Sequence, residues 1–149
     1  MQPIQRILIP IDFSECSEHA LELAANLAGK IGADAVAVHV IAPPTDYLPM
    51  ARELWGAGAK DRLSEQAQAK AERDLEAFRQ RQPEEVREAV RFKIEKGVPY
   101  DRILQDVERE HFDMIVVGSR GRNAADRILM GSVAERLVRH APCPVLVVH

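Results

Sequence analysis

The sequence predicts an α/β protein built on an open, five-stranded parallel sheet with helices on both faces. Short apolar runs typical of strands alternate with longer segments of helical periodicity along the whole chain. The opening run, residues 6–11, is almost continuously apolar, as expected for a parallel strand buried on both faces. The 149 residues suit a single domain, 1–149, without a repeat or linker.

The N-terminal half is predicted to form strand, helix, strand and loop. The first strand reaches its end at Pro10, which lacks an N–H group. Ser14 is a suitable N-cap for the following helix, and Gly32 lies just past its end. Residues 35–41 form the second strand, and the three prolines of residues 42–50 indicate a loop.

The C-terminal half continues the alternation. Residues 59–82 predict a long helix with an apolar stripe, and Pro83 lies past its end. Residues 90–95 alternate apolar and charged side chains, which is typical of an edge strand. A helix starts at Pro99. The remaining elements are a strand over 112–117, a helix from Ser132 and a strand over 144–148. Ser132 and Glu135 have the spacing of a capping box, and Leu137 and Val138 are expected to face inward.

Composition narrows the function classes. The formal net charge of −3 argues against a general nucleic-acid binder. No apolar run approaches the roughly 20 residues that span a membrane, and the N-terminus has no secretory pattern, so a cytoplasmic location without a membrane partner is expected. Cys16 and Cys143 fall at opposite ends of parallel strands, so both are expected to be free thiols.

A glycine pattern follows the strand that ends at Val117. Gly118, two residues, Gly121, nine residues and Gly131-Ser132 lead into the last helix. Glycine permits positive φ and close approach of the backbone, and free amides at a helix N-terminus suit phosphates. The Walker and dinucleotide fingerprints are both absent from the sequence.

This pattern resembles the nucleotide loop of the ATP-binding branch of the universal stress protein (UspA-like) family. Residues 7–12, 38–40, 97–99 and 141–148 are similar to other parts of that family, so the resemblance covers nearly the full length. It implies a Rossmann-like, adenine nucleotide alpha hydrolase-like sheet with strand order 3-2-1-4-5. In such sheets ligands lie beyond the carboxyl ends of the strands, so Asp12 and Gly118 are expected to be neighbours.

The resemblance implies ATP as the ligand, with Mg²⁺ carried by the nucleotide. It places Asp12 against the adenosine, Val40 against the adenine, and the glycine loop around the ribose and phosphates. The candidate nucleotide-binding residues are Pro10, Ile11, Asp12, Val40, Val117, Gly118, Ser119, Arg120, Gly121, Arg122, Gly131, Ser132 and Val133.

Several candidates have structural alternatives. Asp12 also suits capping of the turn into the first helix, and Ser132 suits capping of its own helix. Arg120, Arg122 and Arg127 suit either phosphates or solvent. The histidines show no metal-ligand spacing, and His39 is interpreted as a satisfied core or cleft histidine.

Three functions remain open. The first is a nucleotide-dependent regulatory module of the stress response that acts on an unknown protein partner, with no catalytic residue identified. The second is a slow Mg²⁺-dependent ATPase or adenylyl-transfer enzyme, in which Asp12 holds Mg²⁺ or orients water. The third is a nucleotide-free interaction domain.

Two further features stay open. The uncharged final strand is a hazard if its edge is exposed. The resemblance implies a homodimer through Val145–Val148, and coverage by the chain's own helices is the alternative. Tyr47, Trp55 and the proline-rich loop form either a flap over the crevice or a packing surface.

Overall fold

Five parallel strands form one sheet in the order β3-β2-β1-β4-β5, which confirms the predicted fold class and strand order. The computed structural model describes residues 3–43, 53, 56, 58–121 and 129–149. Most of the predicted proline-rich loop, together with Tyr47, Trp55, Arg122 and Arg127, lies outside those residues. The strands are β1 (Arg6–Pro10), β2 (Asp34–Ile41), β3 (Val90–Lys96), β4 (Met114–Gly118) and β5 (Val145–Val148).

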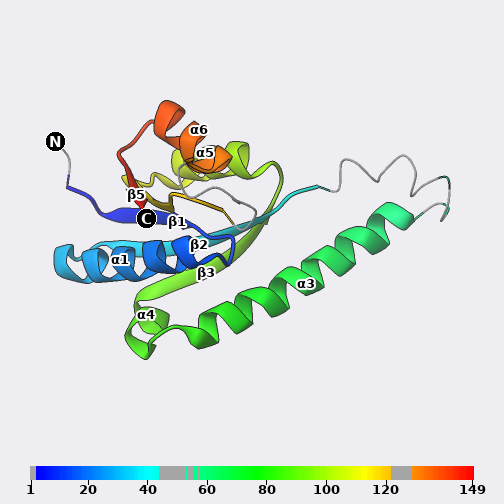
Figure 1. Cartoon of the computed structure of the whole chain (residues 1–149), viewed down its shortest axis with the longest axis horizontal. Coiled ribbons are helices and arrows are strands. Elements are labelled where there is room, and N and C mark those ends of the chain that lie inside the picture. Colours follow the sequence, from blue (N-terminus) through cyan, green and yellow to red (C-terminus); the bar gives the residue numbers. More distant parts are fainter. Residues whose placement is uncertain (1–2, 44–52, 54–55, 57, 122–128) are drawn as a thin grey trace.

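Helices cover both faces of the sheet, as predicted (Figure 1). The helices α1 (Glu15–Ile31), α3 (Ala59–Arg81) and α4 (Glu84–Ala89) lie on one face. The helices α5 (Pro99–Glu110) and α6 (Ser132–His140) lie on the other. The short helix α4 is not among the predicted elements, because six residues are too few to display helical periodicity.

Each face of the sheet has its own apolar core, because side chains alternate along a strand. Ile7 and Ile9 of β1 pack in one core with Phe78 of α3, which is fully buried. Leu8 of β1 packs in the other core with Leu137 of α6. The predicted inward position of Val138 is wrong, since its side chain is 49% exposed. Val138 follows Leu137 by about 100° around the helix, which turns it away from the sheet.

The helix caps correct one prediction and confirm two. The Ser17 amide donates to the Ser14 hydroxyl at 3.2 Å, so Ser14 caps α1. Gly32 ends that helix with φ of 71°. The predicted capping box of α6 is wrong, because Gly131 is its N-cap residue and no side chain caps it. Ser132 instead occupies the first helical position.

The two edges of the sheet differ in chemistry. The edge strand β3 carries Arg91, Lys93, Glu95 and Lys96, in agreement with its predicted edge position. The opposite edge strand, β5, is entirely apolar and only partly buried. Both cysteines are free thiols, as expected, and burial together with the negative charge of Asp113 raises the pKa of Cys143. Within the described residues, we find no helix with the length and apolar character required to cross a bilayer.

Candidate functional site

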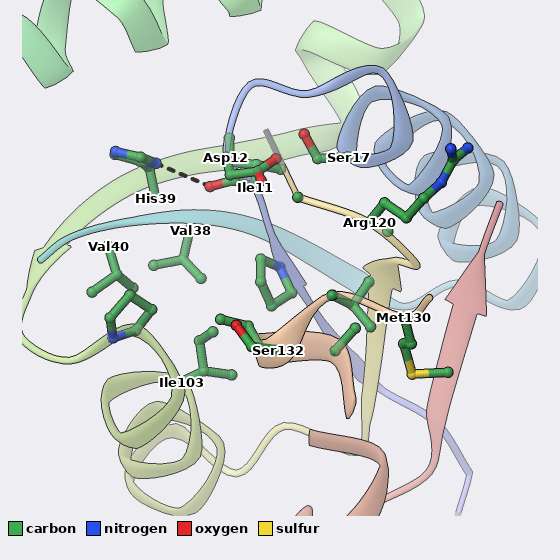
Figure 2. A pocket seen from close by; sticks show the side chains of 18 of the residues that line it. Ile11, Asp12, Ser17, Val38, His39, Val40, Ile103, Arg120, Met130 and Ser132 are labelled. Carbon is green, nitrogen blue, oxygen red and sulfur yellow. Dashed lines mark hydrogen bonds between the residues drawn. The ribbon is translucent and has the colours of Figure 1, made fainter. Parts of the chain in front are cut away.

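A cavity of about 740 Å³ opens where β1, β2 and β4 end (Figure 2). The starts of α5 and α6 complete its wall, so residues distant in sequence meet at the carboxyl edge of the sheet. The predicted residues that line it are Pro10, Ile11, Asp12, Val40, Val117, Gly118, Arg120, Gly121, Gly131, Ser132 and Val133. Ser119 does not line the cavity, and Arg122 lies outside the described residues.

The cavity has an apolar side that sequence reasoning identified only in part. Val38 and Val40 of β2 lie there beside Ile103 of α5 (Figure 2). Ile103 is buried, and its place in the cavity follows from the packing of α5 against β2. Figure 2 shows Arg120 across the cavity from these side chains. The other lining residues that were not predicted are Ser17, His39, Pro99, Leu129, Met130 and Ala134.

Asp12 lies between the start of α1 and the glycine loop. Its Oδ1 accepts a hydrogen bond from the Ser14 amide at 3.1 Å, so the turn-capping alternative is realised. Its Oδ2 lies 2.9 Å from the position that a Cβ on Gly121 would occupy. Asp12 therefore caps the turn and lines the cavity at the same time.

The three glycines of the motif are not needed for positive φ, contrary to the expectation from sequence. Close approach explains Gly118 instead, and little room for a Cβ is left at Gly121 and Gly131. A Cβ on Gly118 would lie 2.7 Å from the Cys16 carbonyl carbon. The absence of a side chain at Gly118 therefore lets the end of β4 pack directly against the first turn of α1. A Cβ on Gly131 would lie 3.2 Å from the Gly121 nitrogen, so the two ends of the loop touch.

Two main-chain amides of the glycine loop already donate hydrogen bonds within the protein and are not available to a ligand. The Ser119 amide donates to the Val148 carbonyl at 2.7 Å, and the Gly131 amide donates to the Ser119 carbonyl at 2.7 Å. The first intrahelical bond of α6 runs from the Glu135 amide to the Gly131 carbonyl. The amides of the cavity-lining residues Ser132, Val133 and Ala134 precede that bond, so they are the donors that the α6 N-terminus offers.

His39 is held at the cavity rim by two contacts. Its Nδ1 lies 3.0 Å from the Ile11 carbonyl oxygen (Figure 2), and its ring stacks on Phe13 with centroids 4.3 Å apart. Phe13 has φ of 66°, a left-handed conformation that is rare for a bulky residue. The interpretation of His39 as a satisfied cleft histidine is confirmed, although its partners are separated from it in sequence.

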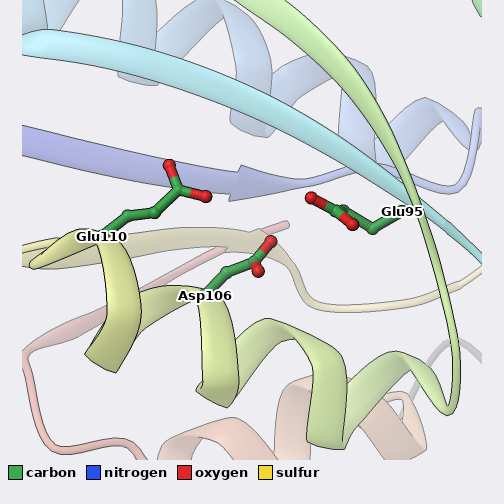
Figure 3. Close-up of side chains that lie close together, drawn as sticks. All are labelled: Glu95, Asp106 and Glu110. Carbon is green, nitrogen blue, oxygen red and sulfur yellow. The ribbon is translucent and has the colours of Figure 1, made fainter.

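Three carboxylates, Glu95, Asp106 and Glu110, gather between β3 and α5 (Figure 3). Cations already neutralise them: Lys93 Nζ lies 2.8 Å from Asp106 and 2.7 Å from Glu110. Arg102 lies 2.9 Å from Asp106 and 3.0 Å from Glu95. We therefore interpret the cluster as an ion-pair network that fastens α5 to the edge of the sheet.

This network shifts two pKa values. Partial burial acts to lower the pKa of Lys93, but the hydrogen bonds and charges of Asp106 and Glu110 outweigh it, so the pKa lies above its ordinary value. The hydrogen bond from Lys93 is the largest influence on Glu110, and it lowers the pKa of that carboxyl against the effect of burial. Both shifts favour the charged forms.

The fold and cavity define an open-sheet α/β protein with a ligand-sized pocket at its carboxyl edge. The sequence model of the universal stress protein family matches residues 3–149. The chain is 33% identical over 144 residues to the universal stress protein MJ0531 of Methanocaldococcus jannaschii, covering 97% of this chain and 81% of that one. The chain therefore belongs to the universal stress protein family.

Two solved structures share the fold. The universal stress protein UspA from Lactobacillus plantarum is 28% identical, with a TM-score of 0.81 and full coverage of both chains. The universal stress protein from Archaeoglobus fulgidus, solved in complex with dAMP, is 22% identical, with a TM-score of 0.62 and coverage of 99% of this chain and 100% of that one. At that identity the likeness concerns the fold alone.

Proposed function

We propose that residues 1–149 form one nucleotide-binding module of the ATP-binding branch of the family, with ATP as ligand and Mg²⁺ carried by the nucleotide. One observation carries the proposal. A single cavity of about 740 Å³ joins an apolar wall suited to a base with the N-terminus of α6, which is suited to phosphates. The dAMP complex of the Archaeoglobus fulgidus relative supports this choice by showing an adenine nucleotide on the same fold in that protein.

The base end is assigned from the geometry of the sheet. The Ile11 amide donates to the Val38 carbonyl at 2.9 Å, so the backbone groups of Val38 face β1. Residues two apart in a strand face the same neighbour, so the amide and carbonyl of Val40 also face the β1 side. The β1–β2 register ends at the pair of Pro10 and Val38. Val40 thus offers an adjacent donor and acceptor to a base edge.

The phosphate end is assigned from charge. The amides of Ser132, Val133 and Ala134, with the positive end of the α6 dipole, favour an anion. Arg120 is the cation among the described residues that line the cavity. The Asp12 carboxylate repels phosphate and accepts from hydroxyl or amine groups, so we assign it to the nucleoside part. The described residues of the cavity contribute one carboxylate, so Mg²⁺ is proposed to be held mostly by phosphates and water.

We favour binding and regulation over catalysis. Among the described cavity residues, Asp12 and His39 are the side chains that commonly act as general acids or bases, and each of them contacts a main-chain group of the protein. A change in loop order on nucleotide binding is proposed to be sensed by a regulatory protein partner. The open apolar edge of β5 supports a homodimer through Val145–Val148.

Ser132→Asp tests the phosphate assignment more cleanly than Gly131→Val. Even a Cβ at Gly131 would lie only 3.2 Å from the Gly121 nitrogen, so the larger valine side chain would also distort the loop. An acid at Ser132 suits the first turn of α6 but repels phosphate by about 4 kcal/mol for unit charges 4 Å apart near a surface. Calorimetric titration with MgATP should therefore show at least about tenfold weaker binding.

Two controls define the outcome. The neutral variant Ser132→Asn should bind MgATP nearly as the wild type does, and adenosine should bind Ser132→Asp and the wild type alike. Equal MgATP affinity in Ser132→Asp would refute the phosphate assignment. Mass spectrometry of small molecules released by heating the purified protein tests nucleotide binding itself. Release of no nucleotide, together with no binding of added MgATP, would favour the interaction domain, and phosphate release above about 1 s⁻¹ would favour an enzyme.

A further inference from the structure

The side chain of His39 contacts the Ile11 carbonyl, which a main-chain amide of β2 would contact in a regular parallel sheet. In a regular parallel pair, the Ile11 amide would donate to Val38 and the Val40 amide would donate back to the Ile11 carbonyl. The first of these bonds is present at 2.9 Å. Among the main-chain bonds of the described residues, the second is absent, and the Ile11 carbonyl is contacted by Nδ1 of His39 at 3.0 Å instead.

A carbonyl oxygen only accepts hydrogen bonds, so Nδ1 of His39 must carry the proton. The side chain of His39 therefore replaces the Val40 amide as the donor to Ile11. The consequence lies one residue further along β2, at Val40, which lines the cavity and whose amide and carbonyl lie on the β1 side beyond the last β1–β2 pair.

Packing fixes the ring in this position. The His39 ring stacks on Phe13, and Phe13 contacts Phe78 with centroids 5.5 Å apart. Phe78 is fully buried in the core beneath α3. The strained left-handed conformation of Phe13 is compatible with a ring that is held on both sides. The aromatic series His39–Phe13–Phe78 thus anchors the rim of the cavity to the core.

We propose that His39 is a specificity-determining positioning residue, which ends the β1–β2 ladder by binding the Ile11 carbonyl and so reserves the main chain of Val40 for the base of the ligand. This inference rests on the proposed nucleotide function and goes beyond it by assigning to His39 the contact that leaves the Val40 main chain available to the base. A main-chain amide beside a carbonyl complements a base edge with an acceptor beside an amino group, as in adenine. Hypoxanthine presents N1–H and a carbonyl on that edge, so its donor and acceptor are reversed.

Two variants separate the hydrogen bond from the packing. His39→Phe keeps a ring to stack on Phe13 but has no donor. His39→Asn keeps a donor near the position of Nδ1 but has no ring. The wild type should bind MgATP at least about tenfold more tightly than MgITP, because the reversed edge leaves main-chain groups unpaired. His39→Phe should bring the ratio close to one, and His39→Asn should largely restore it.

A second measurement needs no nucleotide. Nitrogen-15 NMR at pH 8.5, about two units above the ordinary imidazole pKa, should show the proton of His39 on Nδ1. The Val40 amide should exchange rapidly in the wild type and become protected in His39→Phe, where it is free to donate to Ile11. A proton on Nε2, or a Val40 amide protected in the ligand-free wild type, would overturn the proposal even if His39→Phe failed to fold.

The titrations distinguish the two levels of the argument. A wild type that binds neither nucleotide refutes the proposed function, and the specificity role of His39 falls with it. A wild type that prefers ATP, with the same preference in folded His39→Phe, refutes the role of His39 alone and leaves nucleotide binding intact.

Discussion

Gly118→Ala should destabilise the protein even in the absence of ligand. The new Cβ would lie 2.7 Å from the Cys16 carbonyl carbon, 2.8 Å from its oxygen and 2.9 Å from the Ser17 nitrogen. All three atoms belong to the main chain in the first turn of α1, so no side-chain rotation can relieve the overlap. Relief requires α1 to move away from the end of β4, which opens the core between them.

The expected cost follows from the cost of overpacking a core, about 1–3 kcal/mol. Because the neighbours are main-chain atoms, we expect the upper end, about 3 kcal/mol. For a chain of this size each kcal/mol lowers Tm by about 2–4 °C, so the loss is about 6–12 °C. Scanning calorimetry and urea denaturation of the ligand-free protein measure both quantities.

Gly29→Ala is the matched control. Gly29 lies within α1, and a Cβ there meets nothing within 4 Å. This variant should be as stable as the wild type or more stable by up to about 1 kcal/mol. A ligand-free Gly118→Ala protein that melts within 2 °C of the wild type, roughly the effect of 1 kcal/mol or less, would refute the packing explanation and return Gly118 to a role in ligand access alone.

Two further predictions concern the helix cap and the ion-pair network. Ser14→Ala should lower stability by about 1 kcal/mol through loss of the α1 cap, whereas Ser132→Ala should change it little because Ser132 caps nothing; equal losses in thermal denaturation would contradict this. Lys93→Met should cost about 1.5–3 kcal/mol at pH 7. The lowered pKa of Glu110 stabilises the fold above the ordinary pKa of 4.5, and this stabilisation is lost as pH falls through the folded pKa. The raised pKa of Lys93 stabilises the fold below the ordinary pKa of 10.5, and this stabilisation is lost as pH rises through the folded pKa. Urea denaturation across pH should therefore show the difference between Lys93→Met and the wild type narrowing at both extremes, and a constant difference would contradict the assignment.

Much of the fold was predictable because parallel strands buried on both faces give almost unbroken apolar runs such as residues 6–11. The short helix α4 was not, since its six residues follow a proline that also marks the end of α3. The cap of α6 was misread because Ser132 and Glu135 have capping-box spacing whether or not the chain enters the helix at Ser132. The spacing also does not reveal that the Gly131 amide donates to the Ser119 carbonyl.

The location of the candidate site was predictable to a similar degree. The glycine spacing and the strand ends identified most of the described lining, from Asp12 to Val133. Close approach of the glycine backbone was predictable, but the partner of Gly118 was not, because its contact with Cys16 depends on how α1 packs on β4. The position of His39 was equally hidden, since a histidine in an apolar strand reveals neither the Ile11 carbonyl nor the Phe13 ring. An early sign was available in the polarity of His39 among the valines of β2.

The unlike borders of the sheet limit how copies of this chain can associate. Strand addition needs an uncharged border, and the charged side chains of β3 discourage it there, whereas β5 offers only valine and leucine. The proposed homodimer through β5 would use this edge in both copies, related by a two-fold axis. Growth of that dimer into longer assemblies by strand addition would require the charged edge at β3 as well.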